Sequence, residues 1–341
     1  MTATAAAPPA RREAHEPPEA RGLARDAVRM LVASRAGGLA HARARDLPDH
    51  LRAGDVLVVN TSATLPAALP AHRADGTPLR LHLSTPGGER GRWVVELRDG
   101  AERFAGGRAG ERLVLPGGAR ATLLAPYLAG ARLWLAAIDT GRRRLLEYLA
   151  EHGAPIRYGY VDHGWPLADY QTIFATQPGS AEMPSAGRPF TPELVTALVT
   201  RGIAVAPVTL HTGVSSQEAG EPPYPERYAV PAPTARLVNA ARAGGGRIVA
   251  VGTTVVRALE TVAVGGGAIA AGAGWTRGVV TPQTGVRAVD GLLTGWHEPE
   301  ATHLLMLEAL GGRALMERSY ALALRTGYLW HEFGDVHLIV P

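Results

Sequence analysis

Residues 247–260 read RIVAVGTTVVRALE, and the fold class is inferred first from them. Ile248–Val251 is a short apolar run rich in β-branched residues, and three glycines precede it, so it is predicted to be a buried strand. Gly252 ends the run, and a helical pattern follows in which Val255 and Leu259 share one face. A strand that passes through a glycine turn into an amphipathic helix is typical of an α/β domain.

The turn at the end of this strand is a candidate binding site for an anion or for ribose hydroxyls. Thr253 and Thr254 are predicted to cap the helix, whose first turn presents backbone N–H groups and the positive end of the helix dipole. Arg257 adds a cation one turn into the helix. The alternative is an ordinary structural cap, and the stretch lacks the further glycines of a dinucleotide-binding fingerprint.

The composition limits the classes of protein that fit the chain. Its 341 residues are enough for two domains, and a hydrophobic content of 46% is enough for a sizeable core. The absence of cysteine excludes disulfides, thiolate catalysis and thiolate zinc sites. All 35 basic residues are arginines, and the mild net charge of +4 permits contact with a polyanion without requiring it.

The sequence shows neither a membrane span nor a secretion signal. No apolar run approaches the roughly 20 residues that a membrane-spanning helix needs, and Met1–Pro18 has no apolar signal segment. We therefore expect a cytoplasmic protein that does not associate with membranes. Residues 1–20 are expected to form a disordered tail.

Before residue 67, the sequence predicts strands of an α/β sheet. The candidates are Arg29–Ala33, Leu39–His41 and Val56–Val59, and the last of them ends at Asn60-Thr61-Ser62. In an open α/β sheet, ligands collect at the carboxyl ends of strands, although a polar turn is the alternative explanation for these three residues.

From about residue 67 to residue 152, the pattern changes to short alternating segments separated by glycine-rich turns. Regularly spaced short strands predict a small antiparallel barrel or sandwich. The candidate strands are Leu79–Leu83, Trp93–Leu97, Glu111–Leu115, Ala121–Leu124 and Leu133–Ala137. The basic triplet Arg142–Arg144 is interpreted as a solvated helix start or as a contact for nucleic-acid phosphate.

The second half of the chain returns to an α/β pattern and carries several candidate polar residues. Gln177–Thr191 is a long coil of small residues, a kind of segment that is usually functional or mobile. The strand Ile203–Leu210 ends at His211, which is a structural or a proton-transferring histidine. His297 and His303 are six residues apart, which predicts different faces of a helix, and no metal-binding motif is present, so no metal site is expected.

Taken in order, these segments resemble the S-adenosylmethionine:tRNA ribosyltransferase-isomerase family of the queuosine pathway. The matching pieces occur in the family order from about Arg29 to Val340, and together they are highly specific. They are Gly54–Asn60, Leu65–Ala67, Tyr170–Thr172, Pro178–Ser180, Pro184–Gly187, Phe190–Thr191, Val208–Gly213, Ile248–Glu260, Asp290–Thr294, His297, Pro299, Leu304–Leu307 and Phe333–Asp335.

The resemblance implies an α/β main domain interrupted by an inserted small antiparallel β-barrel domain. The α/β catalytic domain is expected at residues 21–66 and 153–341, and the barrel at residues 67–152. The family reaction transfers the ribose-derived part of S-adenosylmethionine to 7-aminomethyl-7-deazaguanine at the tRNA wobble position, which gives epoxyqueuosine and releases adenine and methionine. S-adenosylmethionine is consumed as a co-substrate, so no other cofactor is expected. The resemblance also implies contact with tRNA, and we expect a monomer or a weak oligomer.

This reaction needs a base beside the sulfonium, polar groups for the ribose and adenine, and a binding site for the methionine carboxylate. The candidate catalytic residues are His211, Arg257, Glu260, His297 and Asp335. The candidate substrate-binding residues are Asn60, Gln171, Ser185, Gly187, Glu226, Gly252, Thr253 and Thr254. Every catalytic candidate except the arginine is able to transfer a proton, so the base is not assigned among them.

The chain departs from the family pattern at several site positions and is therefore a divergent member. Ala63 and Ala68 stand where the family has arginines, and Arg188-Pro189 replaces a segment that carries a histidine. The histidine-rich loop after His211 is shortened, and Glu226 is the residue that matches its acid. Two alternatives stay open: an S-adenosylmethionine-dependent paralogue acting on a small nucleoside-like acceptor, or a non-catalytic nucleoside- or RNA-binding descendant.

Overall fold

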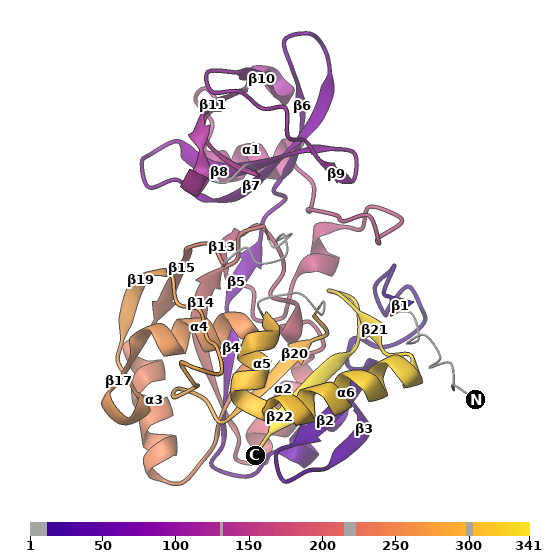
Figure 1. Cartoon of the computed structure of the whole chain (residues 1–341), viewed down its shortest axis with the longest axis vertical. Helices are drawn as coiled ribbons and strands as arrows, with labels where there is room; N and C mark the ends of the chain where they lie inside the picture. The colour runs from indigo at the N-terminus through magenta and orange to yellow at the C-terminus, as the bar shows by residue number, and fades with distance from the viewer. Residues whose placement is uncertain (1–11, 130–131, 215–222, 298–302) are drawn as a thin grey trace, which may run out of the picture.

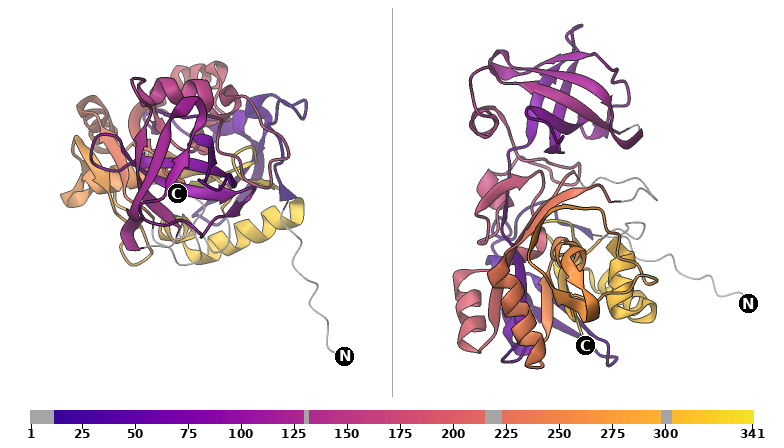
Figure 2. Two further views of the ribbon diagram at one scale, coloured as in Figure 1. Left: turned by 90° about the horizontal axis from the view of Figure 1, so that it is seen from above. Right: turned by 90° about the vertical axis from the view of Figure 1, so that its left-hand side faces the viewer.

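The computed structural model describes residues 12–129, 132–214, 223–297 and 303–341. The chain forms an α/β part and a β-barrel, and the barrel lies at one end of the long axis of the molecule (Figures 1 and 2). No helix within these ranges is long and apolar enough to cross a membrane.

The barrel is a closed antiparallel sheet, as the sequence predicts. Its strands are β6 (Ala68–His72), β7 (Pro78–Pro86), β8 (Arg92–Asp99), β10 (Arg112–Val114), β11 (Arg120–Pro126) and β12 (Leu133–Asp139). They pair in the order β12-β11-β10-β6-β7-β8, and β12 pairs again with β8, which closes the barrel. The short strand β9 (Glu102–Arg103) adds to the edge of β8, and helix α1 (Leu145–His152) packs against the barrel core through Tyr148 and Leu149.

The α/β part is built on a sheet of nine strands. Their order is β19-β15-β14-β4-β16-β20-β22-β2-β3. The bounds are β2 (Arg29–Ser34), β3 (Leu39–Arg43), β4 (Val56–Asn60), β14 (Ala204–His211), β15 (Glu226–Val230), β16 (Ile248–Val251), β19 (Gly272–Thr276), β20 (Gly291–Gly295) and β22 (Val336–Val340). The central strands β14, β4, β16 and β20 run parallel to one another, so their carboxyl ends meet at the same edge of the sheet.

Helices cover both faces of this sheet, which explains why its central strands are apolar throughout. Val56 and Val58 of β4 face the core shared with α3 (Ala232–Ala243), α4 (Thr253–Val262), α5 (His303–Gly311) and α6 (Arg313–Thr326). Leu57 and Val59 face the opposite core, which α2 (Pro192–Thr200) and the 3-10 helix η2 (Ala44–His50) complete. The main architecture is therefore an α/β domain, as the sequence predicts.

Three short strand pairs tie loops to this framework. They are β5 (Ser62–Thr64) with β13 (Gln177–Ser180), β1 (Arg12–Glu13) with β21 (Leu329–Trp330), and β17 (Ala263–Val264) with β18 (Ala268–Ile269).

The prediction of a disordered tail is wrong for residues 12–20, because β1 is paired and Ala14 is only 1% exposed. Residues 1–11 lie outside the described ranges. We propose that residues 21–66 and 153–341 form the α/β domain and that residues 67–152 form the inserted barrel domain.

Candidate active site

A cavity of about 520 Å³ lies at the carboxyl edge of the parallel strands. Its walls come from the segments that follow β14, β16 and β20, and from the coil after β13. Ile156 and Val214 line it and also belong to the hydrophobic cluster of the barrel, so the cavity lies where the barrel meets the α/β domain. This position agrees with the rule that ligands bind outside the carboxyl ends of strands in open α/β sheets.

The turn between β16 and α4 forms one wall, as the sequence predicts. Gly252, Thr253 and Thr254 all line the cavity. The expected threonine cap is wrong, because the N-cap residue is Gly252, whose φ of 98° suits glycine far better than other residues. Thr254 Oγ1 instead lies 3.3 Å from Asn60 Nδ2. The first turn of α4 still directs backbone N–H groups and the positive helix end toward the cavity.

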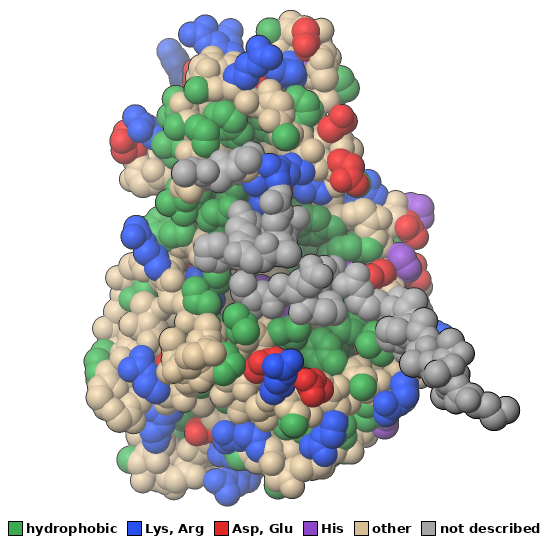
Figure 3. Space-filling view, in the orientation of Figure 1, with side chains coloured by type: hydrophobic (Ala, Val, Ile, Leu, Met, Phe, Trp, Pro, Cys, Tyr) green, Lys and Arg blue, Asp and Glu red, His purple; other side chains and the backbone are tan. Residues whose placement is uncertain are grey.

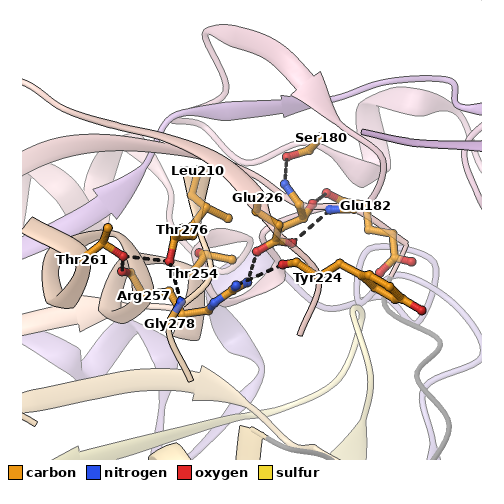
Figure 4. Close-up of polar contacts among 12 residues, drawn as sticks. Ser180, Glu182, Leu210, Tyr224, Glu226, Thr254, Arg257, Thr261, Thr276 and Gly278 are labelled. Atoms are coloured by element: carbon orange, nitrogen blue, oxygen red, sulfur yellow. Dashed lines mark hydrogen bonds and ion pairs between the residues drawn. The ribbon is translucent and has the colours of Figure 1, made fainter. Parts of the chain in front are cut away.

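Arg257 stands beside this turn in a buried ion pair (Figure 4). Its guanidinium donates hydrogen bonds to Glu226 on β15 and, over 3.1 Å, to the backbone oxygen of Tyr224. Glu226 also accepts a hydrogen bond of 3.0 Å from the N–H of Gly213. Burial raises the pKa of Glu226, and the Arg257 charge and the Gly213 N–H oppose that shift. The predicted cation is thus fixed in place but compensated by a carboxylate, while its Nε has no hydrogen-bond partner within the described part of the chain.

Two histidines lie together on the wall that follows β20. His297 Nε2 is 2.8 Å from Thr294 Oγ1, and the ring stacks on His303, with centroids 4.6 Å apart and planes 16° apart. The prediction that these residues lie on different helix faces is wrong, because His297 precedes α5 and His303 begins it. Burial, followed by the neighbouring histidines, holds the pKa of His297 well below its usual value, and burial with Arg257 lowers the pKa of His303 to about 4. Both rings are therefore neutral at pH 7.

Asn60 and His211 end neighbouring strands but do not line the cavity. Asn60 holds the end of β14 to β4, because its Nδ2 donates to the Leu210 oxygen over 2.8 Å and its Oδ1 accepts from the Leu210 N–H over 3.0 Å. His211 Nδ1 is 2.7 Å from Ser62 Oγ, and burial lowers its pKa. Ser62 Oγ in turn is 2.6 Å from Ser180 Oγ. These residues position the strand ends beneath the cavity.

Two predicted proton-transferring groups, Glu260 and Asp335, bind backbone N–H groups away from the cavity lining. Glu260 Oε1 accepts hydrogen bonds of 2.7 Å from the N–H groups of Arg287 and Ala288, near the far end of α4. Asp335 accepts hydrogen bonds of 2.8 Å from the N–H groups of Arg29 and Leu329. Burial raises the pKa of Asp335, but neither carboxylate lines the cavity.

The remaining predicted binding residues divide between the cavity and its support. Ser185 lines the cavity. Gln171 lies behind it, where its amide exchanges hydrogen bonds of 3.0 and 2.8 Å with the backbone of the cavity residue Thr64. Gly187 packs against Thr172, where an added Cβ would lie 3.3 Å from the methyl carbon of the threonine.

The sequence does not predict a further group of tyrosines, acids and one histidine that also line the cavity. These residues are Tyr158, Tyr160, Tyr170, Glu182, His331 and Glu332. Their signals in the sequence are weak: Glu182 falls in the long coil of small residues, and the tyrosines stand in irregular segments after the barrel. Within the described ranges, no group of three or more His, Cys, Asp or Glu side chains is placed to hold a metal ion.

The fold and this cavity define an enzyme of the α/β class whose site lies at the carboxyl ends of parallel strands. A family model described as "Queuosine biosynthesis protein" matches residues 7–339. The chain is 38% identical to an S-adenosylmethionine:tRNA ribosyltransferase-isomerase of Moorella thermoacetica, over 93% of this chain and 94% of that protein. A protein of the same name from Thermus thermophilus is 37% identical over 93% of each chain.

A solved structure supports the same relationship. The crystal structure of S-adenosylmethionine tRNA ribosyltransferase from Thermotoga maritima is 28% identical in sequence and covers 96% of this chain and 96% of its own, with a TM-score of 0.52. This chain belongs to the queuosine biosynthesis protein family, which confirms the resemblance found in the sequence.

Proposed function

We propose that this protein transfers the ribosyl moiety of S-adenosylmethionine to 7-aminomethyl-7-deazaguanine in tRNA and rearranges it to epoxyqueuosine. Adenine and methionine leave in the reaction. The observation that carries the proposal is the cavity at the β16–α4 turn, in a chain that belongs to this family over almost its whole length.

The β16–α4 turn suits the methionine carboxylate of S-adenosylmethionine. Helix N-termini bind anions through free N–H groups and the helix dipole, and Thr253 and Thr254 add hydroxyl groups at the cavity wall. Because Glu226 already compensates Arg257, the helix end and the hydroxyls supply most of the attraction for the carboxylate. The guanidinium Nε remains a donor for a ligand oxygen.

His297 is the best-placed base for the proton beside the sulfonium. A neutral imidazole accepts a proton, and the depressed pKa of His297 keeps it neutral at pH 7. The Thr294 hydroxyl, 2.8 Å from Nε2, fixes the orientation of the ring. Of the other proton-transferring candidates, His211 contacts Ser62 beneath the cavity, and Glu260 and Asp335 accept hydrogen bonds from backbone N–H groups. We therefore assign these three residues supporting roles.

The distribution of charge favours tRNA over a small acceptor. Residues 67–152 contain 13 arginines and 9 acidic residues, whereas the rest of the chain contains 22 of each. The whole net charge of +4 therefore belongs to the barrel segment, and Figure 3 shows arginine side chains gathered at the outer end of the barrel. A basic surface on the barrel domain fits the phosphates of an RNA whose modified base enters the cavity.

Adenine release tests this proposal. Purified protein is incubated with S-adenosylmethionine alone, with tRNA carrying 7-aminomethyl-7-deazaguanine, and with the free nucleobase. Release that requires the modified tRNA is the expected result. Release with the free nucleobase but not with the tRNA would identify a small-acceptor paralogue, and tight binding of S-adenosylmethionine without release would identify a non-catalytic descendant.

A further inference from the structure

One wall of the cavity carries two carboxyl groups, each bound to a tyrosine. The Tyr160 hydroxyl donates a hydrogen bond of 2.6 Å to Glu332 Oε2, and the Tyr158 hydroxyl donates to Glu182 Oε1. All four side chains line the cavity. The two tyrosine rings stack with their centroids 6.0 Å apart, so the two tyrosine–glutamate pairs are neighbours on one wall.

The same wall contains a buried hydroxyl that lacks a partner. Tyr170 lines the cavity and is only 4% exposed, and its hydroxyl makes no hydrogen bond to any residue that the structure describes. A buried hydroxyl that stays unpaired costs about 1–3 kcal/mol. A polar ligand group in the cavity would remove this cost, so the hydroxyl is independent evidence of a ligand at this wall.

Residues from both ends of the chain support this wall. The ring of His331 stacks on Tyr160, with centroids 3.7 Å apart and planes 8° apart. His331 has a φ of 71°, an uncommon conformation for a residue other than glycine, and its Nε2 pairs with Glu13 of β1. Such local strain persists only where the surroundings fix it, and it is common at ligand sites.

We propose that Glu332, Glu182 and the Tyr170 hydroxyl bind the primary ammonium group of the acceptor, and that Glu332 removes its proton. The inference rests on the proposed function, because it assigns the site of the aminomethyl group within that reaction. A primary ammonium has three N–H donors and no acceptor, and this wall offers oxygen acceptors and aromatic ring faces.

The proton transfer prepares the amine for attack. One N–H bond of the ammonium breaks and leaves its electron pair on nitrogen, while a new O–H bond forms on Glu332. The neutral amine then has a lone pair for the ribosyl carbon, and no further reactant is needed. Burial raises the pKa of Glu332, which makes its carboxylate a stronger base than an exposed glutamate.

Two RNA probes separate ammonium recognition from general RNA binding. Both are anticodon stem-loops: one carries 7-aminomethyl-7-deazaguanine, and the other carries the uncharged 7-cyano analogue. We expect wild-type protein to bind the amine probe at least about tenfold more tightly, as for a hydrogen bond to a charged group. Glu332→Gln and Glu182→Gln should each lose most of this preference, and Tyr170→Phe, which removes only the hydroxyl, should reduce it severalfold. The exposed Glu193 provides the control, because Glu193→Gln should keep the full preference.

A single-turnover measurement with saturating substrates tests the role of Glu332 as the base. Glu332→Gln should slow adenine release by about 100-fold or more, the usual effect of losing a general base, while Glu182→Gln should act mainly on the affinity for the amine probe. Equal binding of the two probes by wild-type protein, or an unchanged preference in folded Glu332→Gln and Tyr170→Phe proteins, would overturn the inference. Adenine release by wild-type protein is measured separately, so failure here is distinguishable from failure of the proposed function.

Discussion

The ion pair between Arg257 and Glu226 makes a quantitative prediction about stability and activity together. Arg257 is 7% exposed, and the Glu226 side chain is 14% exposed. Arg257→Met keeps most of the side-chain volume but leaves the carboxylate without its counter-charge, with the Gly213 N–H as a remaining donor. Breaking a buried pair in this way costs about 3–5 kcal/mol of the free energy of unfolding, which most domains survive because their total is about 5–15 kcal/mol.

The double variant identifies the cause of this loss. Glu226→Gln combined with Arg257→Met removes both charges, and we expect its stability to lie within about 1–2 kcal/mol of wild type, because uncharged replacements of a buried pair are often nearly neutral. Adenine release should be reduced to a similar degree in the single and the double variant, because both lack the Arg257 Nε–H donor at the cavity wall. The exposed Arg236 on α3 provides the control, and Arg236→Met should change stability by less than about 0.5 kcal/mol.

The pH dependence has a definite sign. Burial raises the pKa of Glu226 above its unfolded value of 4.5, so the folded protein binds the proton more tightly than the unfolded chain. A raised pKa favours folding at low pH, and this contribution is lost as pH rises through the folded pKa. The deficit of Arg257→Met should therefore be larger at pH 8 than at pH 5. Urea denaturation at both pH values measures it, and an Arg257→Met protein with wild-type stability at pH 8 and wild-type adenine release would refute the reasoning.

Three further predictions concern the cavity turn, the core and the barrel. Gly252→Ala should lower the free energy of unfolding by about 1–3 kcal/mol and weaken S-adenosylmethionine binding, because its φ of 98° strains alanine and the new Cβ would crowd the turn; denaturation and calorimetric titration measure the two effects. His337 is fully buried, and its ring nitrogens lack partners in the described ranges. Burial lowers its pKa to about 3, so below about pH 6.5 the unfolded chain binds a proton at His337 that the folded protein does not bind. The free energy of unfolding therefore decreases as pH falls below about 6.5. The slope of the free energy of unfolding against pH depends on how many more protons the unfolded chain binds than the folded protein. His337→Phe should lower this difference by about one proton at acid pH, and an unchanged slope in thermal melts would contradict this. Reversing the charges of the exposed Arg112, Arg120 and Arg142 should reduce the slope of log K for RNA binding against log salt concentration by about 0.7–0.9 for each lost phosphate contact. The affinity for S-adenosylmethionine should not change. The same number of charge reversals on α3 and α6 serves as the control.

Local patterns predicted the framework of the site. The run Ile248–Val251 is buried on both faces and forms β16 as expected, because a continuous apolar run between glycines fits a central parallel strand. The barrel was predictable from the spacing of its short strands. The strand that ends at His211 was also predicted, because an apolar run closed by polar residues marks a strand end.

The sequence does not predict which side chains from distant parts of the chain meet at the cavity. The sequence predicts Arg257 as a cation at the turn but not its ion pair, because its partner Glu226 comes from β15, which antiparallel pairing with β14 places in the sheet beside α4. Glu182 and Glu332 are 150 residues apart in the chain, and they share a wall because β21 and β22 return next to the coil after β13. No periodic pattern encodes such long-range contacts, so Glu182 and Glu332 are not predicted from the sequence, while Glu226 and the strands beneath the cavity are.

The structure of this protein with S-adenosylmethionine bound tests the central claim most directly. We expect the sulfonium nucleoside to occupy the cavity, with its methionine carboxylate within hydrogen-bond distance of the N–H groups of Thr253 or Thr254 and with His297 facing the carbon beside the sulfur. A ligand bound at another site, or a cavity filled by side chains when the ligand is present, would contradict the account.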